Sequence, residues 1–317
     1  MNRFVAGIVW LLLLLALGAL AGFGFGTALL HRIPPHALLL RLIGGGAAMG
    51  ADLFLFGLCF AWLPGARRPP GAMPELGVLQ GVWAVVGYGA TMLAASLLTN
   101  ILFAIKDAVL IVHHARHLID FTGSAYLLTD FLAVEAAVAL FTVNYLHRFS
   151  PVQRHDGSAA GIAWRPAPAR AYAMAALLAL AIVALVILMY HLVPPDIAKL
   201  QNLPMAKLFS VTGPALLLPI LIATFLAPVL EEIIFRGIAF AGLAARFGTV
   251  WASVISVAVF ILVHAPQKIY YLPGFLDVGL VALAAVLLRL QYRSIRPGIL
   301  LHILYNGGSM VAVALFQ

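Results

Sequence analysis

Two adjacent glutamates lie inside an apolar stretch in the last third of this 317-residue chain. Each ionisable side chain at the centre of a membrane span costs about 2.5–3.5 kcal/mol, so a chain that keeps two must pair them or use them. Glu232 and Arg236 are four residues apart with the acid first, and they can pair along one helix face. Glu231 points about 100° away around the same helix and lacks that partner. Glu231 is therefore the candidate general base, although a purely structural ion pair would also explain the motif.

Two later apolar runs carry histidine. His264 ends one run, and His302 opens the last one with Asn306 four residues later. Because side chains at i and i+4 share a helix face, His302 and Asn306 can point at a common target. At 1.5 Å per residue, Glu231 and His264 each lie about 20 Å from a shared turn near Gly248, so they can meet at one level. Each histidine alone could be a packed core residue, but one shared site accounts for all three segments together.

The elements that hold these residues must be membrane helices. Hydrophobic residues make up 64% of the chain and charged residues 9%, with a mean hydropathy of +1.06. Soluble domains are about 45–50% apolar and about 25% charged. Since a span needs about 20 residues, we expect an all-α polytopic transmembrane helical bundle of about eight or nine spans. The candidate runs lie at about 5–30, 42–63, 76–105, 118–146, 172–194, 214–236, 249–265, 275–291 and 298–316.

The segment 147–171, with four arginines among Pro, Gly and Ser, is the best internal boundary. It divides an N-terminal transmembrane bundle of unknown role, residues 1–170, from residues 171–317, which hold the motifs within 214–316. Basic residues favour the connectors on the side of the N-terminus, which predicts a cytoplasmic N-terminus in a cell (plasma) membrane. The first run could be a cleaved secretory signal, but its length favours a retained helix.

The net charge of +8 does not indicate nucleic-acid binding. The basic residues lie in short connectors, where they fix the orientation of a membrane protein. The expected surroundings are the lipid bilayer, and we expect no nucleic-acid partner.

The three motif segments resemble the CPBP family of membrane proteins. This family groups type II CAAX prenyl endopeptidases with bacteriocin-processing and self-immunity proteins. Its pattern is Glu-Glu-x-x-x-Arg, then Phe-x-x-x-His, then His-x-x-x-Asn. All three motifs occur here in that order without a substitution, over about residues 214–316.

The resemblance implies an intramembrane endopeptidase of the CAAX-protease or peptide-processing type. Its substrate would be a membrane-anchored or hydrophobic peptide. In this mechanism a glutamate, helped by a histidine, activates water for attack on a peptide carbonyl. A second glutamate and an arginine hold the geometry, while histidine and asparagine donate hydrogen bonds to the oxyanion. The implied site residues are Glu231, His264, Glu232, Arg236, His302 and Asn306.

We expect that no cofactor is required, with zinc as the alternative. Two histidines and a glutamate can bind zinc and leave a fourth position open. If zinc is used, its ligands would be Glu231, His264 and His302. However, the His-Glu-x-x-His spacing of many metalloproteases is absent, and the resembled family has been described both as metal-dependent and as a glutamate-type peptidase.

Two other function classes stay open at the level of sequence. A non-catalytic membrane scaffold or bacteriocin-immunity factor could keep the same helices. A proton-coupled transporter could use Asp52, Asp130 and Glu135, which lie within N-terminal apolar runs. Internal symmetry between two halves would favour a transporter, and the sequence shows none.

Overall fold

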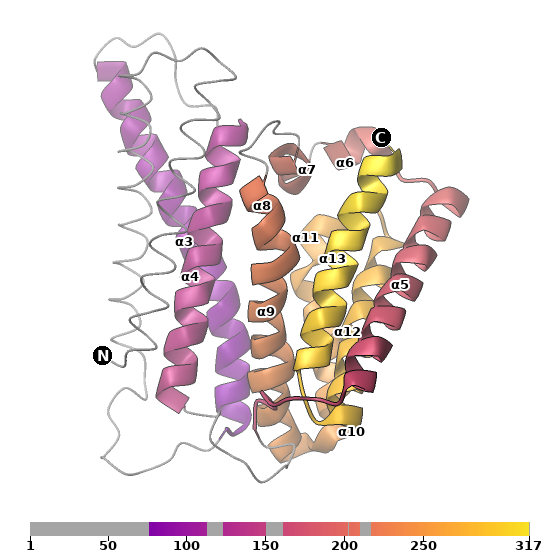
Figure 1. Ribbon diagram of the computed structural model, residues 1–317. Coiled ribbons are helices and arrows are strands. Elements are labelled where there is room, and N and C mark those ends of the chain that lie inside the picture. The colour runs from indigo at the N-terminus through magenta and orange to yellow at the C-terminus, as the bar shows by residue number, and fades with distance from the viewer. Residues whose placement is uncertain (1–75, 113–122, 150–160, 202, 210–216, 317) are drawn as a thin grey trace. The chain divides into compact units, whose positions relative to one another are not determined.

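The computed structural model describes residues 76–112, 123–149, 161–201, 203–209 and 217–316 (Figure 1). Within these ranges every regular element is a helix, which confirms the predicted all-α class. The predicted spans at 5–30 and 42–63, and the question of a cleaved signal, lie outside the described residues.

Thirteen segments follow one another along the described chain. They are α3 (Val78–Val112), α4 (Ser124–Phe149), α5 (Ala169–Leu192), α6 (Ile197–Gln201), α7 (Pro204–Phe209), α8 (Leu217–Leu221), η3 (Ile222–Leu226), α9 (Ala227–Glu231), η4 (Glu232–Ala239), α10 (Phe240–Val263), α11 (Ala265–Lys268), α12 (Gly274–Tyr292) and α13 (Arg296–Phe316). The segments η3 and η4 are π-helical.

Five stretches of helix in the described part are long and apolar enough to cross a membrane. They are Val78–Leu110, Ala125–Leu146, Ala169–Leu192, Leu217–Val263 and Gly274–Tyr292. On α5, Leu177 and Leu180 are 62% and 67% exposed, as expected for side chains whose solvent is lipid rather than water. The chain is therefore an integral membrane protein.

The longest of these stretches contains the predicted turn near Gly248. Gly248 has φ 76° and ψ 169°, and it interrupts the helical conformation inside α10. Glycine adopts positive φ without the steric cost that a Cβ imposes. The chain therefore changes direction between the run that carries Glu231 and the run that ends at His264.

The described chain belongs to two compact units, each assembled from separated stretches of sequence. Unit 2 comprises Pro69–Tyr88, Tyr145–Gln201 and Ala223–Gln317, and it contains every predicted site residue. In unit 1, Ser96 Oγ donates a hydrogen bond to Asp130 Oδ2 at 3.2 Å. Of the acids that a transporter would use, Asp52 lies outside the described residues.

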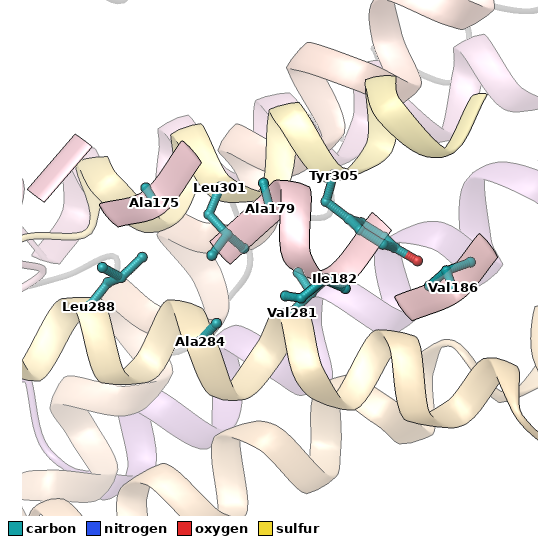
Figure 2. Packing of buried hydrophobic residues seen from close by; sticks show 9 residues of the cluster. All are labelled: Ala175, Ala179, Ile182, Val186, Val281, Ala284, Leu288, Leu301 and Tyr305. Atoms are coloured by element: carbon teal, nitrogen blue, oxygen red, sulfur yellow. The ribbon is translucent and has the colours of Figure 1, made fainter. Parts of the chain in front are cut away.

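The core of unit 2 lies between α5, α12 and α13. Figure 2 shows nine side chains of this cluster, contributed by all three helices. They are Ala175, Ala179, Ile182, Val186, Val281, Ala284, Leu288, Leu301 and Tyr305. Alanines one turn apart on α5 let the helix backbones approach closely, which is how membrane helices gain packing contacts. This core supports α13, the helix that carries His302.

Candidate active site

The two glutamates lie at a junction between α-helical and π-helical backbone. Glu231 ends α9, and Glu232 begins η4, which runs to Ala239. A π-helical turn carries i→i+5 hydrogen bonds, is rare, and is frequent at functional sites. The local backbone around the glutamates is thus unlike that of an ordinary membrane helix.

Glu232 is the centre of a buried charged cluster. Its Oε1 lies 3.2 Å from Arg236 Nη1, and both side chains are fully buried. The same oxygen lies 3.2 Å from Nδ1 of His302, which is also buried. The predicted ion pair along η4 therefore forms, and it also ties η4 to α13. Charges attract more strongly in a buried site that excludes water, and removing either partner destabilises the protein because it leaves an uncompensated buried charge.

Glu231 faces two histidines, His264 at the end of α10 and His302 on α13. Its Oε2 lies 4.0 Å from His264 Nε2 and 3.8 Å from His302 Nε2. These separations exceed a direct hydrogen bond but suit groups that share a bridging water. The side chain of Glu231 is 13% exposed, whereas that of Glu232 is 0% exposed. The two neighbouring acids therefore have different surroundings, as the sequence predicted.

A backbone contact fixes the orientation of the His264 ring. Its Nδ1 lies 2.8 Å from the carbonyl oxygen of Phe260, one turn earlier. Because a carbonyl only accepts hydrogen bonds, Nδ1 must carry the proton. In the neutral ring, the lone pair is then on Nε2, the nitrogen that faces Glu231.

Phe260 is the aromatic centre of the site. The Arg236 guanidinium carbon lies 4.0 Å from its ring centroid. Its ring also lies 4.5 Å from that of His264 and 5.8 Å from that of His302, between centroids. A cation over an aromatic face is stabilised by the ring quadrupole. The phenylalanine of the Phe-x-x-x-His motif thus packs against three of the site's polar side chains.

The connector that follows His264 is held by an ion pair. Lys268 Nζ lies 3.1 Å from Asp277 Oδ2, and the Asp277 side chain is only 2% exposed. Lys268 ends α11, one turn after His264, and Asp277 lies in the first turn of α12. This contact limits the movement of the segment on which His264 sits.

Asn306 bonds η3, the segment that precedes α9 and the two glutamates. Its Nδ2 donates to the carbonyl oxygen of Ala223 at 2.8 Å. Ala223 lies in η3, where an i→i+5 bond would have to come from the amide of Pro228. Proline has no amide hydrogen, so Asn306 supplies the donor that Pro228 lacks. Of the other five predicted residues, Arg236, His264 and His302 lie around the two glutamates.

Two neighbours of the glutamates were not identified from the sequence. The hydroxyl of Tyr88, on α3, lies 3.5 Å from Glu231 Oε1. A Cβ added to Gly298 would lie 3.3 Å from Glu232 Oε2, so glycine leaves room for the buried carboxylate. Tyr88 lies on a buried face of α3 with Gly81 and Ala84. The spacing of three and four residues between these positions is the sequence signal that could have indicated an inward-facing tyrosine.

Glu231 and the two histidines are residue types that bind zinc, but their atoms lie farther apart than the ligand atoms of a tetrahedral zinc site. Tetrahedral zinc with ligand bonds of about 2.0–2.1 Å places its ligand atoms about 3.3 Å apart. The separations of 3.8 and 4.0 Å from Glu231 to the two histidines are longer. Within the described ranges, no three His, Cys, Asp or Glu side chains form a group that could hold a metal ion.

Comparison with known proteins identifies the same part of the chain. Residues 213–308 match the family described as type II CAAX prenyl endopeptidase Rce1-like. No curated protein and no solved structure matches the chain. The matched range contains all six predicted site residues and nearly coincides with the predicted range of 214–316. Residues 213–308 therefore form a domain of the Rce1-like type II CAAX prenyl endopeptidase (CPBP) family.

Proposed function

We propose that this protein is an intramembrane endopeptidase that hydrolyses a peptide bond near the membrane surface. The observation that carries the proposal is the Glu231 carboxylate, which faces two histidine nitrogens at 4.0 and 3.8 Å. This arrangement lies within a domain of a peptidase family. A carboxylate beside imidazoles is suited to general acid–base chemistry.

The nucleophile in this proposal is a water molecule between Glu231 and His264. The water donates one hydrogen bond to Glu231 Oε2 and the other to the lone pair on His264 Nε2. As its oxygen attacks the peptide carbonyl carbon, one proton passes to Glu231. The C–N bond then breaks, and Glu231 returns this proton to the leaving amine. The products are a new carboxyl terminus and a new amino terminus.

His302 and Asn306 are the proposed donors to the oxyanion. His302 uses Nδ1 on Glu232, so its Nε2 is the nitrogen that can reach the substrate. A ring that donates through both nitrogens is positively charged, and Glu231 and Glu232 together offset the charges of His302 and Arg236. Arg236 in turn holds Glu232 in place. Fixed donors of this kind stabilise the transition state because they need no reorganisation during the reaction.

The proposed substrate is a membrane-anchored or hydrophobic peptide, such as a CAAX-type or bacteriocin-like precursor. The test is purified protein in liposomes, incubated with anchored peptides that either carry or lack a prenylated C-terminal cysteine. Mass spectrometry would identify the cleaved bond. We expect one defined cleavage near the membrane surface. If no anchored peptide is cleaved under any condition, the non-catalytic scaffold or immunity factor replaces this proposal.

Metal dependence follows from the proposed role of Glu231. Since Glu231 and His264 activate the water without a metal, we expect cleavage to survive prolonged incubation with a strong chelator. If zinc is used instead, Glu231, His264 and His302 would hold it, and zinc would lower the pKa of its bound water. Loss of activity that stoichiometric zinc restores would contradict the metal-free mechanism.

Asn306→Ala distinguishes an oxyanion donor from a packing residue. Loss of an oxyanion donor slows turnover by about 10²–10³-fold, whereas a hydrogen bond between membrane helices contributes only about 0.6 kcal/mol on average. One amide hydrogen of Asn306 bonds the carbonyl oxygen of Ala223, and in the proposed mechanism the second donates to the oxyanion. We therefore expect the large loss of turnover together with a small loss of thermal stability, measured by steady-state kinetics and thermal unfolding.

The matched control is Asn100→Ala. Asn100 also donates a hydrogen bond from its side-chain Nδ2 to a backbone carbonyl oxygen, that of Ser96, at 2.8 Å within α3. Its loss should affect stability but not turnover. If Asn306→Ala behaves in the same way, Asn306 is a packing residue, and His302 alone would have to stabilise the oxyanion.

A further inference from the structure

The first turns of α3 pack very closely on the helix that carries the glutamates. A Cβ added to Gly242 would lie 2.5 Å from the carbonyl oxygen of Gly77 and 2.9 Å from Gly81 Cα. A Cβ on Gly81 would lie 2.9 Å from the carbonyl oxygen of Ala239. Only glycine allows the two backbones to approach this closely. The register of α3 against η4 and α10 is thereby fixed.

This register places Tyr88 beside Glu231. Gly81, Ala84 and Tyr88 form one buried face of α3, with the spacing of neighbours on a helix. The Tyr88 side chain is 6% exposed, and its hydroxyl lies 3.5 Å from Glu231 Oε1. Its ring meets the ring of Phe235 edge to face, with centroids 5.4 Å apart. The ring contact holds the hydroxyl at the carboxylate.

The two oxygens of Glu231 therefore face different groups. Oε1 faces the Tyr88 hydroxyl, whereas Oε2 faces His264 and His302. Rotation of a glutamate carboxylate about its last bond is broad and poorly restrained by itself. A donor on Oε1 restrains that rotation and keeps Oε2 directed at the histidines. Hydrogen bonds of catalytic groups are often long before the substrate binds and shorten in the complex.

We propose that Tyr88 is a positioning residue for Glu231. Its hydroxyl donates to Oε1 and keeps its own proton, while Oε2 accepts the proton from water. Tyr88 lies outside the matched family range of 213–308, so this role assigns a function to part of the N-terminal region. The inference rests on the proposed role of Glu231 as general base.

The test is Tyr88→Phe, which removes one oxygen atom and keeps the ring packed on Phe235. A hydrogen bond to a charged group is worth a factor of about 10–100. We expect kcat to fall by that factor while KM and the melting temperature stay close to the wild-type values. A residue that only supports the fold would instead lower the melting temperature and leave kcat per folded molecule unchanged.

Tyr145→Phe is the matched control. Tyr145 is also 6% exposed, and its hydroxyl donates to the carbonyl oxygen of Gln80 on the same turns of α3. Its loss should lower thermal stability without changing kcat. Normal kcat in Tyr88→Phe, with active wild-type protein, overturns the role of Tyr88 but leaves the proposed function intact. Failure of the wild-type protein to cleave any peptide overturns both.

Discussion

Glu231→Gln should reduce the rate of peptide cleavage by about 10²–10⁴-fold, the range that a positioned general base contributes. The amide keeps the shape of the carboxylate but cannot accept a proton from water. Expression and detergent stability should change little, because the close ionic contacts of Arg236 and the Nδ1 contact of His302 are made with Glu232. The measurement is the initial rate of product formation, normalised to folded protein.

The matched control for this change is Asp130→Asn. Asp130 is another acid of a membrane helix, and it accepts a hydrogen bond from Ser96 at 3.2 Å. Its neutralisation should leave cleavage unaffected. Full turnover in Glu231→Gln would show that Glu231 is not the general base.

Glu232→Gln should destabilise the protein as well as inactivate it. Arg236 would remain fully buried beside a neutral amide, and breaking a buried pair in this way typically costs about 3–5 kcal/mol. His302 would also lose the carboxylate that orients its ring. We expect a large fall in the melting temperature and loss of cleavage in the remaining folded protein. Thermal unfolding and cleavage assays on the same sample would measure both effects.

A double variant separates these two consequences. Replacing a whole buried ion pair with uncharged side chains of similar volume is often neutral or stabilising. Glu232→Gln combined with Arg236→Met should therefore recover much of the lost stability but none of the activity. Equal stability of Glu232→Gln and wild-type protein would show that Glu232 does not compensate the buried charge of Arg236.

The helices, and several contacts within the candidate site, could be predicted from the sequence for identifiable reasons. Long apolar runs indicate spans because lipid cannot satisfy backbone hydrogen bonds, so the spanning segments must be helical. The i,i+4 spacing of Glu232 and Arg236 indicated their ion pair, which forms at 3.2 Å. Equal distances from the turn at Gly248 indicated that Glu231 and His264 would meet, and their side chains lie 4.0 Å apart.

Other features depend on contacts that no local pattern contains. In the π-helical segment η3, the carbonyl oxygen of Ala223 cannot be bonded by Pro228, which has no amide hydrogen. It accepts a hydrogen bond from Asn306 on α13 instead. The contact between Tyr88 and Glu231 joins residues 143 positions apart. It exists because glycines on α3 and α10 allow a close approach. Without the packing of these helices, a tyrosine in an apolar run has no visible partner.

In the proposed mechanism, water activated at Glu231 attacks a peptide carbonyl. The most direct test is a single-turnover reaction in oxygen-18 water, with enzyme in excess over an anchored peptide and both products analysed by mass spectrometry. If water is the nucleophile, we expect one heavy oxygen in the new carboxyl terminus of the peptide and none in the enzyme fragment that contains Glu231. Heavy oxygen in that enzyme fragment, or a peptide product without heavy oxygen, would rule out direct attack by water activated at Glu231.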